Sequence, residues 1–254
     1  MKRFIFAFLL CLCPLSTVAA EEMKALVTHV IDGDTFVTQK GDHVRLLGIN
    51  TPERGRDNRP AEPYSAKATE RLANLIDDKT VTLVFDTHRT DRYKRLLAHV
   101  YLADGTWVNK KLIDEGLAHV YSFADNRAHI QTLLTAEQMA RDNQIGLWST
   151  PRWRTRNVDD TFGKKEIGSF YIVRGVVKNT ATVRGTTYLN FGEDWRTDFT
   201  AEIIPGAEPL FTEHGLPPLS YKGLEVEVRG VIKPVNGIMI SVSHPEQIQI
   251  LSRN

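Results

Sequence analysis

The stretch from Ile31 to Glu53 constrains this chain most, because it gathers carboxylates, an amide and an arginine within one short span. It reads IDGDTFVTQKGDHVRLLGINTPE. Gly33 and Gly41 mark two tight turns, and the runs around them are strand-like. We therefore expect a hairpin and a third strand, with an acidic turn at one end.

The polar groups of this stretch are those that a hard metal ion and a phosphate need together. Asp34 and Asn50 offer side-chain oxygens to one cation, with a backbone carbonyl near Thr51 as a third ligand. All-oxygen ligation favours Ca²⁺ or Mg²⁺ over zinc. Cleavage of a phosphodiester also needs an activated water and fixed cations, for which we select Glu53, Arg45 and Arg95.

Each of these residues also has an ordinary structural interpretation. An Asp-Gly-Asp sequence is more often a plain hairpin turn than a metal site. Arg45 and Arg95 are of a type that is commonly solvated or salt-bridged, and Glu53 can cap a turn. The functional interpretation depends on the combination.

The first half of the chain predicts five strands and three helices. The strands are expected at 24–31, 35–38, 43–49, 80–85 and 96–102. Helices are expected from Pro63, over 108–117 and over 127–144, the first with a buried stripe and the third with Met139 among its apolar positions. A helix between the third and fourth strands favours a closed barrel of the OB type.

A change of composition divides the chain. Residues 151–167 are rich in Arg and Asp and lack apolar periodicity, so we interpret them as a linker between domains at 21–150 and 168–254. Five further runs predict a second OB-like barrel, with a short helix before the fourth: 170–177, 186–191, 198–204, 225–232 and 238–242. The predicted fold class is mainly β with helices (α+β).

Residues 1–20 predict a secretory signal peptide, with Lys2 and Arg3 before an apolar run and Val18-Ala19-Ala20 at the cleavage site. An uncleaved anchor is the alternative, although the apolar run is about half a bilayer span. Both cysteines lie in this segment, so we expect an exported protein, periplasmic or secreted, without disulfides.

The remaining chain has 30 Lys and Arg for 31 Asp and Glu, which excludes a globally basic nucleic-acid coat protein. From Val158 onward there are ten basic and twelve acidic residues, which disfavours a strong electrostatic groove there. Four aromatic residues of this half either form a base-stacking platform or pack its core: Tyr188, Phe191, Trp195 and Phe199.

Three motifs together resemble the signature of staphylococcal nuclease-like (thermonuclease) domains: Ile31–Thr35, Arg45–Glu53 and Arg89–Arg95, followed by the helix VNKKLIDEGLA. The resemblance covers roughly residues 23–150. It implies an OB barrel with helices and a Ca²⁺-dependent endonuclease that hydrolyses DNA and RNA and leaves 3′-phosphate ends. We expect a monomer. The run 186–195 resembles OB-type modules that follow such nuclease domains in some exported bacterial proteins.

The resemblance also implies a role for each matching position. Asp34 and the Thr51 carbonyl would bind calcium, and Glu53 would be the general base. The other roles are phosphate binding and transition-state stabilisation by Arg45 and Arg95, support of the metal ligands by Asp32, and contact with the bound nucleotide by Tyr93.

Asn50 departs from the family, which carries a carboxylate ligand at this position. The lost charge predicts weaker calcium binding and a higher calcium requirement. It also keeps open a catalytically weakened nucleic-acid-binding protein with the same fold, which intact Arg45, Glu53 and Arg95 disfavour. A purely structural two-barrel envelope protein would not explain the co-located acidic and basic groups.

Overall fold

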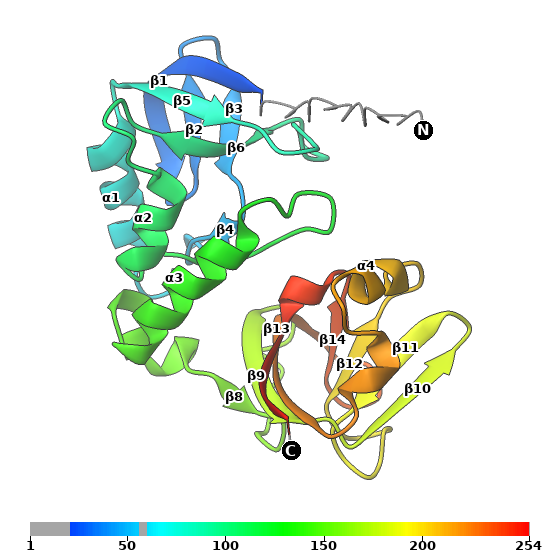
Figure 1. Cartoon of the computed structure of the whole chain (residues 1–254). Coiled ribbons are helices and arrows are strands. Elements are labelled where there is room, and N and C mark those ends of the chain that lie inside the picture. Colours follow the sequence, from blue (N-terminus) through cyan, green and yellow to red (C-terminus); the bar gives the residue numbers. More distant parts are fainter. Residues whose placement is uncertain (1–20, 56–59, 254) are drawn as a thin grey trace, which may run out of the picture.

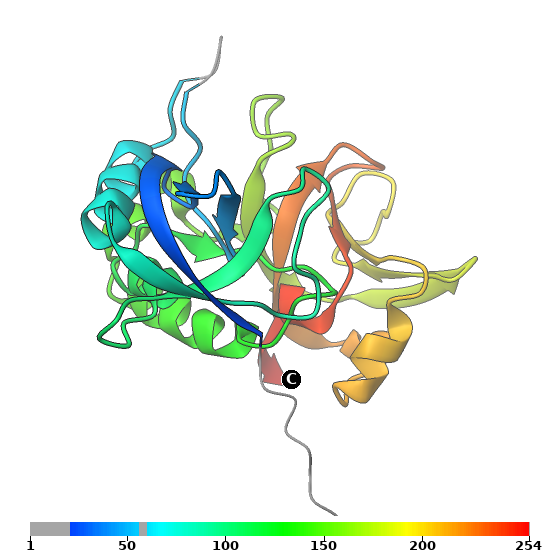
Figure 2. The ribbon, with the colours of Figure 1, turned by 90° about the horizontal axis from the view of Figure 1, so that it is seen from above.

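The structure is a computed structural model that describes residues 21–55 and 60–253. The predicted signal peptide lies outside these residues. Two β-rich units lie side by side, the blue-to-green half of the chain forming one and the yellow-to-red half the other (Figures 1 and 2). Within the described residues, none of the helices combines the length and apolarity needed to cross a bilayer.

The first unit is a closed barrel with the strand order β1-β2-β3-β6-β5. β3 and β6 are parallel, and the other neighbouring strands are antiparallel. This is the predicted OB-type barrel, which is therefore confirmed. Its strands are β1 (Glu22–Asp32), β2 (Thr35–Thr38), β3 (His43–Leu46), β5 (Thr80–Val84) and β6 (Leu96–Tyr101).

Three helices accompany the barrel: α1 (Ser65–Ile76), α2 (Val108–Asp114) and α3 (Ile130–Asp142). α1 buries its predicted stripe but begins after Pro63, because Tyr64 before it has a left-handed φ of 75°. α2 and α3 are shorter than their predicted ranges. Met139, expected among the apolar positions of α3, does not face the core: the residue is 64% exposed, whereas Ala136 and Ala140 are buried.

The predicted third strand, 43–49, is interrupted. β3 ends at Leu46, and Gly48 turns the chain with a φ of 79°. A Cβ on Gly48 would lie 2.8 Å from Leu133 of α3, so this close passage requires glycine. The chain then forms β4 (Ile49–Asn50), which pairs with β7 (His119–Val120), a strand that the sequence did not predict. Asn50 therefore lies on a separate two-stranded sheet.

The second unit is a curled sheet of eight strands in the order β10-β11-β12-β14-β13-β9-β8, with β15 also paired to β13. All five predicted runs are present, whereas β8, β10 and β15 were not predicted. The strands are β8 (Arg156–Asn157), β9 (Phe170–Val176), β10 (Asn179–Val183), β11 (Thr186–Asn190), β12 (Thr200–Ile203), β13 (Leu224–Lys233), β14 (Met239–Val242) and β15 (Ile248–Arg253). The helical pieces of this unit are α4 (Glu208–Glu213) and the 3₁₀ turns η3 (Pro218–Tyr221) and η4 (Pro245–Gln247). Two further 3₁₀ turns, η1 (Gly146–Ser149) and η2 (Pro151–Trp153), precede it.

The strand order of the second unit repeats that of the barrel. β12 and β14 are parallel, as β3 and β6 are. When β9 and β10 are taken as two halves of one strand, the order around the sheet is first, second, third, fifth and fourth in both units. This shared order supports a second OB-like barrel, which stays a prediction.

The segment predicted as a linker is ordered and packed between the units. β8 pairs with β9, and Val158 and Phe162 pack against the core of the second unit. A small separate core joins Leu147 and Trp153 to Ile172 of β9. Residues 151–167 are therefore part of the contact between the two units.

Candidate active site

The turn between β1 and β2 is pressed against the rest of the first unit. A Cβ on Gly33 would lie 2.6 Å from the Thr51 hydroxyl and 2.7 Å from Ala68 of α1, so glycine allows the turn to reach both. Asp32 accepts a hydrogen bond from the Asp34 N–H at 3.2 Å, which fixes the turn. The carboxylate of Asp34 is thereby directed into the unit.

Asp34 is the centre of a hydrogen-bond network. Its side chain is buried, and it accepts hydrogen bonds from the Thr51 N–H at 3.0 Å, the Thr51 hydroxyl at 3.3 Å and the Thr35 hydroxyl at 3.0 Å. Arg45 forms an ion pair with the same carboxylate. Burial alone would raise the pKa of Asp34, but Arg45 and these hydrogen bonds outweigh it and hold the pKa below its usual value.

Arg45 joins the turn to β4. Its Nη2 donates to the Asn50 side-chain oxygen at 2.6 Å and lies 3.4 Å from the Ile49 carbonyl oxygen. The Asn50 amide in turn donates to the Thr51 carbonyl at 3.1 Å. The structure therefore brings together four of the predicted residues, and the oxygens of Asp34, Asn50 and Thr51 belong to one network.

Glu53 follows this network on an exposed stretch. Its backbone N–H donates to the Glu62 carboxylate at 2.9 Å, and Glu62 forms an ion pair with Arg152 at 2.8 Å. Partial burial and the nearby charges of Asp34 and Glu62 raise the pKa of Glu53. A carboxylate with a raised pKa is the more basic one, which suits a proton acceptor.

Arg95 lies just before β6, the strand that pairs with β3 beside Arg45. Among the described contacts its guanidinium is held by Asp91 at 2.7 Å, and its charge centre lies 5.5 Å from the ring centroid of Tyr93. The ring of Tyr93 is 64% exposed. The structure thus places Arg95 and Tyr93 together on one loop, with Arg95 paired to Asp91 and not to the Asp34 network.

No cluster of three or more His, Cys, Asp or Glu suited to a metal ion is present within the described residues. The candidate ligand oxygens are the carboxylate of Asp34, both of whose oxygens already accept hydrogen bonds, the side-chain amide of Asn50 and the backbone carbonyl of Thr51. They fit a hard cation by chemical type, and their low charge fits weak binding.

Sequence reasoning missed a buried link between this site and the second unit. Glu137 of α3 accepts the N–H of Val120 at 2.7 Å, and Val120 pairs with Ile49. The other carboxylate oxygen of Glu137 lies 2.7 Å from Arg229 of β13, and both side chains are at most 4% exposed. The pair joins the strand that carries Asn50 to the second unit. Arg229 follows Glu225 and Glu227 at alternate positions of β13, so the sequence pattern gave no separate signal for the pair.

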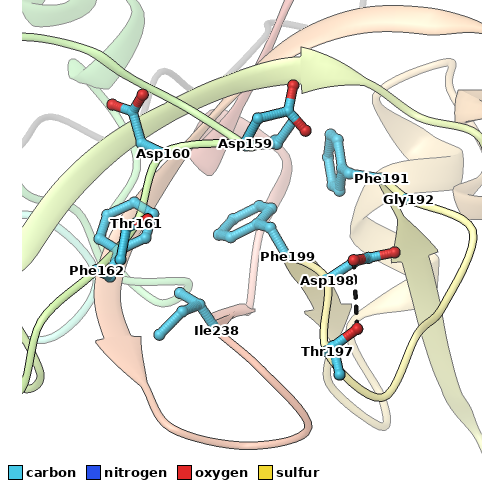
Figure 3. Close-up of a pocket in the computed structure, with 11 residues that line it drawn as sticks. Asp159, Asp160, Thr161, Phe162, Phe191, Gly192, Thr197, Asp198, Phe199 and Ile238 are labelled. Atoms are coloured by element: carbon cyan, nitrogen blue, oxygen red, sulfur yellow. Dashed lines mark hydrogen bonds between the residues drawn. The ribbon is translucent and has the colours of Figure 1, made fainter.

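A cavity of about 400 Å³ lies in the second unit (Figure 3). Asp159, Asp160 and Asp198 line it, and the described lining residues include no Lys or Arg. Phe191 and Phe199 are buried at its floor, whereas Trp195 is half exposed and lies elsewhere. Of the two alternatives for the aromatic residues of this unit, packing in the core therefore holds for Phe191 and Phe199, and the cavity beside them is acidic.

A five-stranded barrel of OB order carries a buried acid at its first turn, paired with an arginine of β3 and followed by a glutamate beyond β4, and this is the arrangement expected of an OB-fold nuclease. Residues 43–150 match the family described as staphylococcal nuclease homologue. The chain is 35% identical over 126 residues to a thermonuclease of Staphylococcus intermedius, which covers 48% of this chain and 74% of that protein.

Two further relatives match a similar length of the chain. A thermonuclease of Staphylococcus hyicus is 32% identical over 133 residues, 51% of this chain and 78% of that protein. Endonuclease YncB of Bacillus subtilis (strain 168) is 39% identical over 132 residues, 50% of this chain and 62% of that protein. The chain belongs to the staphylococcal nuclease family, and the predicted hydrolase class is confirmed.

Proposed function

We propose that this protein is a calcium-dependent nuclease that hydrolyses phosphodiester bonds of DNA, RNA or both with low sequence specificity. The observation that carries the proposal is the network in which Arg45 contacts Asp34 and Asn50 while Thr51 holds the same carboxylate. A fixed cation next to converging oxygen donors matches the needs of phosphate chemistry.

Asp34, Asn50 and the Thr51 carbonyl would hold the calcium ion. Bound there, the ion supplies positive charge against the phosphate oxygens. Asp32 supports this set because it fixes the backbone N–H of Asp34. Since Asn50 contributes an amide in place of a carboxylate, we expect half-saturation toward the millimolar range.

The chain's own side chains then perform the remaining tasks. Glu53 accepts the proton of the attacking water, for which its raised pKa suits it. Arg45 and Arg95 donate to the phosphate oxygens and stabilise the charge that develops there. The exposed ring of Tyr93, beside Arg95, contacts the nucleotide. The expected products carry 3′-phosphate ends.

A second candidate is a catalytically weakened nucleic-acid-binding protein. It is favoured by one observation: Arg45 already occupies the oxygens of Asp34 and Asn50 that a cation would need. For either candidate we propose export by the predicted signal peptide to the periplasm or the medium, a monomeric state, and an OB-like accessory domain at 168–254.

The direct test incubates the purified chain from residue 21 with plasmid DNA and with total RNA, over a calcium series and with chelator. Digestion that needs calcium supports the nuclease. Binding of nucleic acid without cleavage at any calcium concentration selects the second candidate.

A further inference from the structure

A second cavity, of about 290 Å³, lies between the two units. The end of β7 and the chain after it form one wall, and β13 and β14 of the curled sheet contribute to the other. Val120 in the first wall is the backbone partner of Ile49, whose carbonyl oxygen lies 3.4 Å from Arg45. The cavity therefore begins one strand away from the proposed phosphate-binding arginine.

Both units contribute aromatic rings to this cavity. The ring centroid of Tyr121 lies 5.3 Å from that of Phe123 and 6.0 Å from that of Phe170, the first residue of β9. Phe123 is 42% exposed, so part of the aromatic surface is open to a ligand. Aromatic rings stack on unpaired bases with little regard to sequence, because every base has a π face.

The charge of the lining favours an anion. Lys233 is half exposed and donates a hydrogen bond to Ser241 across the sheet. It also forms a long ion pair, at 3.9 Å, with Glu202, which is outside the lining. Arg229 is engaged with Glu137. None of the described lining residues is Asp or Glu, whereas three aspartates line the other cavity. Because Lys233 stays half exposed and the described lining carries no carboxylate, this cavity suits a phosphate better than the acidic one does.

We propose that the cavity between the units is a subsite for an unpaired segment of the nucleic-acid substrate. In it, the second unit supplies Lys233 to a phosphate and Phe170, with Phe123 of the first unit, to a base. The inference rests on the proposed function and gives the second unit a part in binding the substrate. A base within a duplex cannot enter, because it is already stacked and paired.

The subsite is tested by binding of a fluorescent single-stranded thymidine decamer over a salt series. The protein carries Glu53→Gln throughout, so that the decamer is not cleaved. The slope of log K against log salt is negative, and Lys233→Gln should make it shallower by about 0.7, the value for one phosphate contact on a single strand. Phe123→Ala should weaken binding about five-fold without changing the slope. The matched control is Lys178→Gln, an exposed lysine between β9 and β10 and outside the cavity, which should leave both quantities unchanged.

Equal slopes for Lys233→Gln and Lys178→Gln would overturn the proposal. So would an equal loss of affinity for single-stranded and duplex decamers in Phe123→Ala. Failure of the proposed function is seen separately, since it is the absence of calcium-dependent cleavage by the unaltered protein. Both substituted side chains are exposed, and matching urea midpoints verify that the variants are folded.

Discussion

The two units share a strand order but differ at the turn between their first two strands. In the barrel, Gly33 is pressed against Thr51 and α1, and the aspartate after it is buried. In the second unit, with β9 and β10 taken as one strand, the corresponding turn lies between β10 and β11 at Arg184-Gly185. There a Cβ on the glycine would meet only Pro205, at 3.9 Å, among the described atoms. One turn is held by its neighbours and carries charged groups inward, whereas the other projects into solvent.

The strand order alone therefore does not make a site. Gly48 takes the chain off the barrel wall, and β4 then carries Asn50 to Arg45. The site therefore depends on α1 and β4 packing against the turn, which buries Asp34 and lets it share hydrogen bonds with Arg45. The comparison can be tested at several points.

The largest effect is expected at Glu53. Glu53→Gln keeps the shape of the side chain but removes the proton acceptor, so kcat should fall about 10²–10⁴-fold. Arg184→Ala, at the exposed turn of the second unit, should leave kcat within about two-fold. Plasmid digestion followed over time measures both, and similar rates for the two variants would mean that the barrel turn is not the site.

The link between the units should matter next. Arg229→Ala leaves the buried carboxylate of Glu137 without its partner, which should lower the free energy of unfolding by about 3–5 kcal/mol. Arg229→Met combined with Glu137→Gln should recover much of this, since no buried charge remains. Urea unfolding monitored by tryptophan fluorescence provides the values. A loss below about 1 kcal/mol for the single variant would show that the pair does not hold the units together.

The contact between the two units should also weaken in acid, through His244. His244 is buried between Ser122 and Ser243, with Glu246, Arg127 and Asp125 nearby, and burial lowers its pKa to about 4. Unfolding returns that pKa toward the ordinary histidine value of 6.5. The free energy of unfolding is therefore highest above pH 6.5 and falls as the pH drops toward 4, by up to about 3 kcal/mol. Urea unfolding at pH 7, 6, 5 and 4 measures the slope, which His244→Gln should flatten. An unchanged slope in that variant would assign the acid sensitivity elsewhere.

A smaller effect is expected at Asn50. Asn50→Asp restores a second carboxylate beside Asp34, which should lower the calcium concentration for half-maximal cleavage about tenfold. The measurement is a calcium titration of initial rates for both proteins. Coincident titrations would contradict a metal role for this position.

The sequence predicted the barrel and its charged turn well, because both depend on local pattern. Turn glycines and β-branched runs located the first two strands, and the Asp34, Arg45 and Thr51 positions lie within one short span. Arg95 lies far along the chain from this span, so its selection depended on its charge and on the resemblance of Arg89–Arg95 to the family motif.

The rest depended on contacts between distant segments. β4 and β7 are two residues each, too short for any periodicity, and they form only because the chain turns at Gly48. The Glu137–Arg229 pair and the cavity beside it arise where two halves of the chain meet. Met139 was misplaced because it directly precedes the buried Ala140, and adjacent helix residues point about 100° apart, so the apolar sequence did not show which of the two faces the core.

Calcium-dependent cleavage by Asp34→Asn tests most directly whether the acidic turn of the barrel is the metal-dependent site. The substitution preserves the size of the side chain but removes the one buried carboxylate at the turn. We expect calcium-stimulated digestion of plasmid and RNA to be lost while the protein remains folded. Cleavage with an unchanged calcium dependence would contradict it.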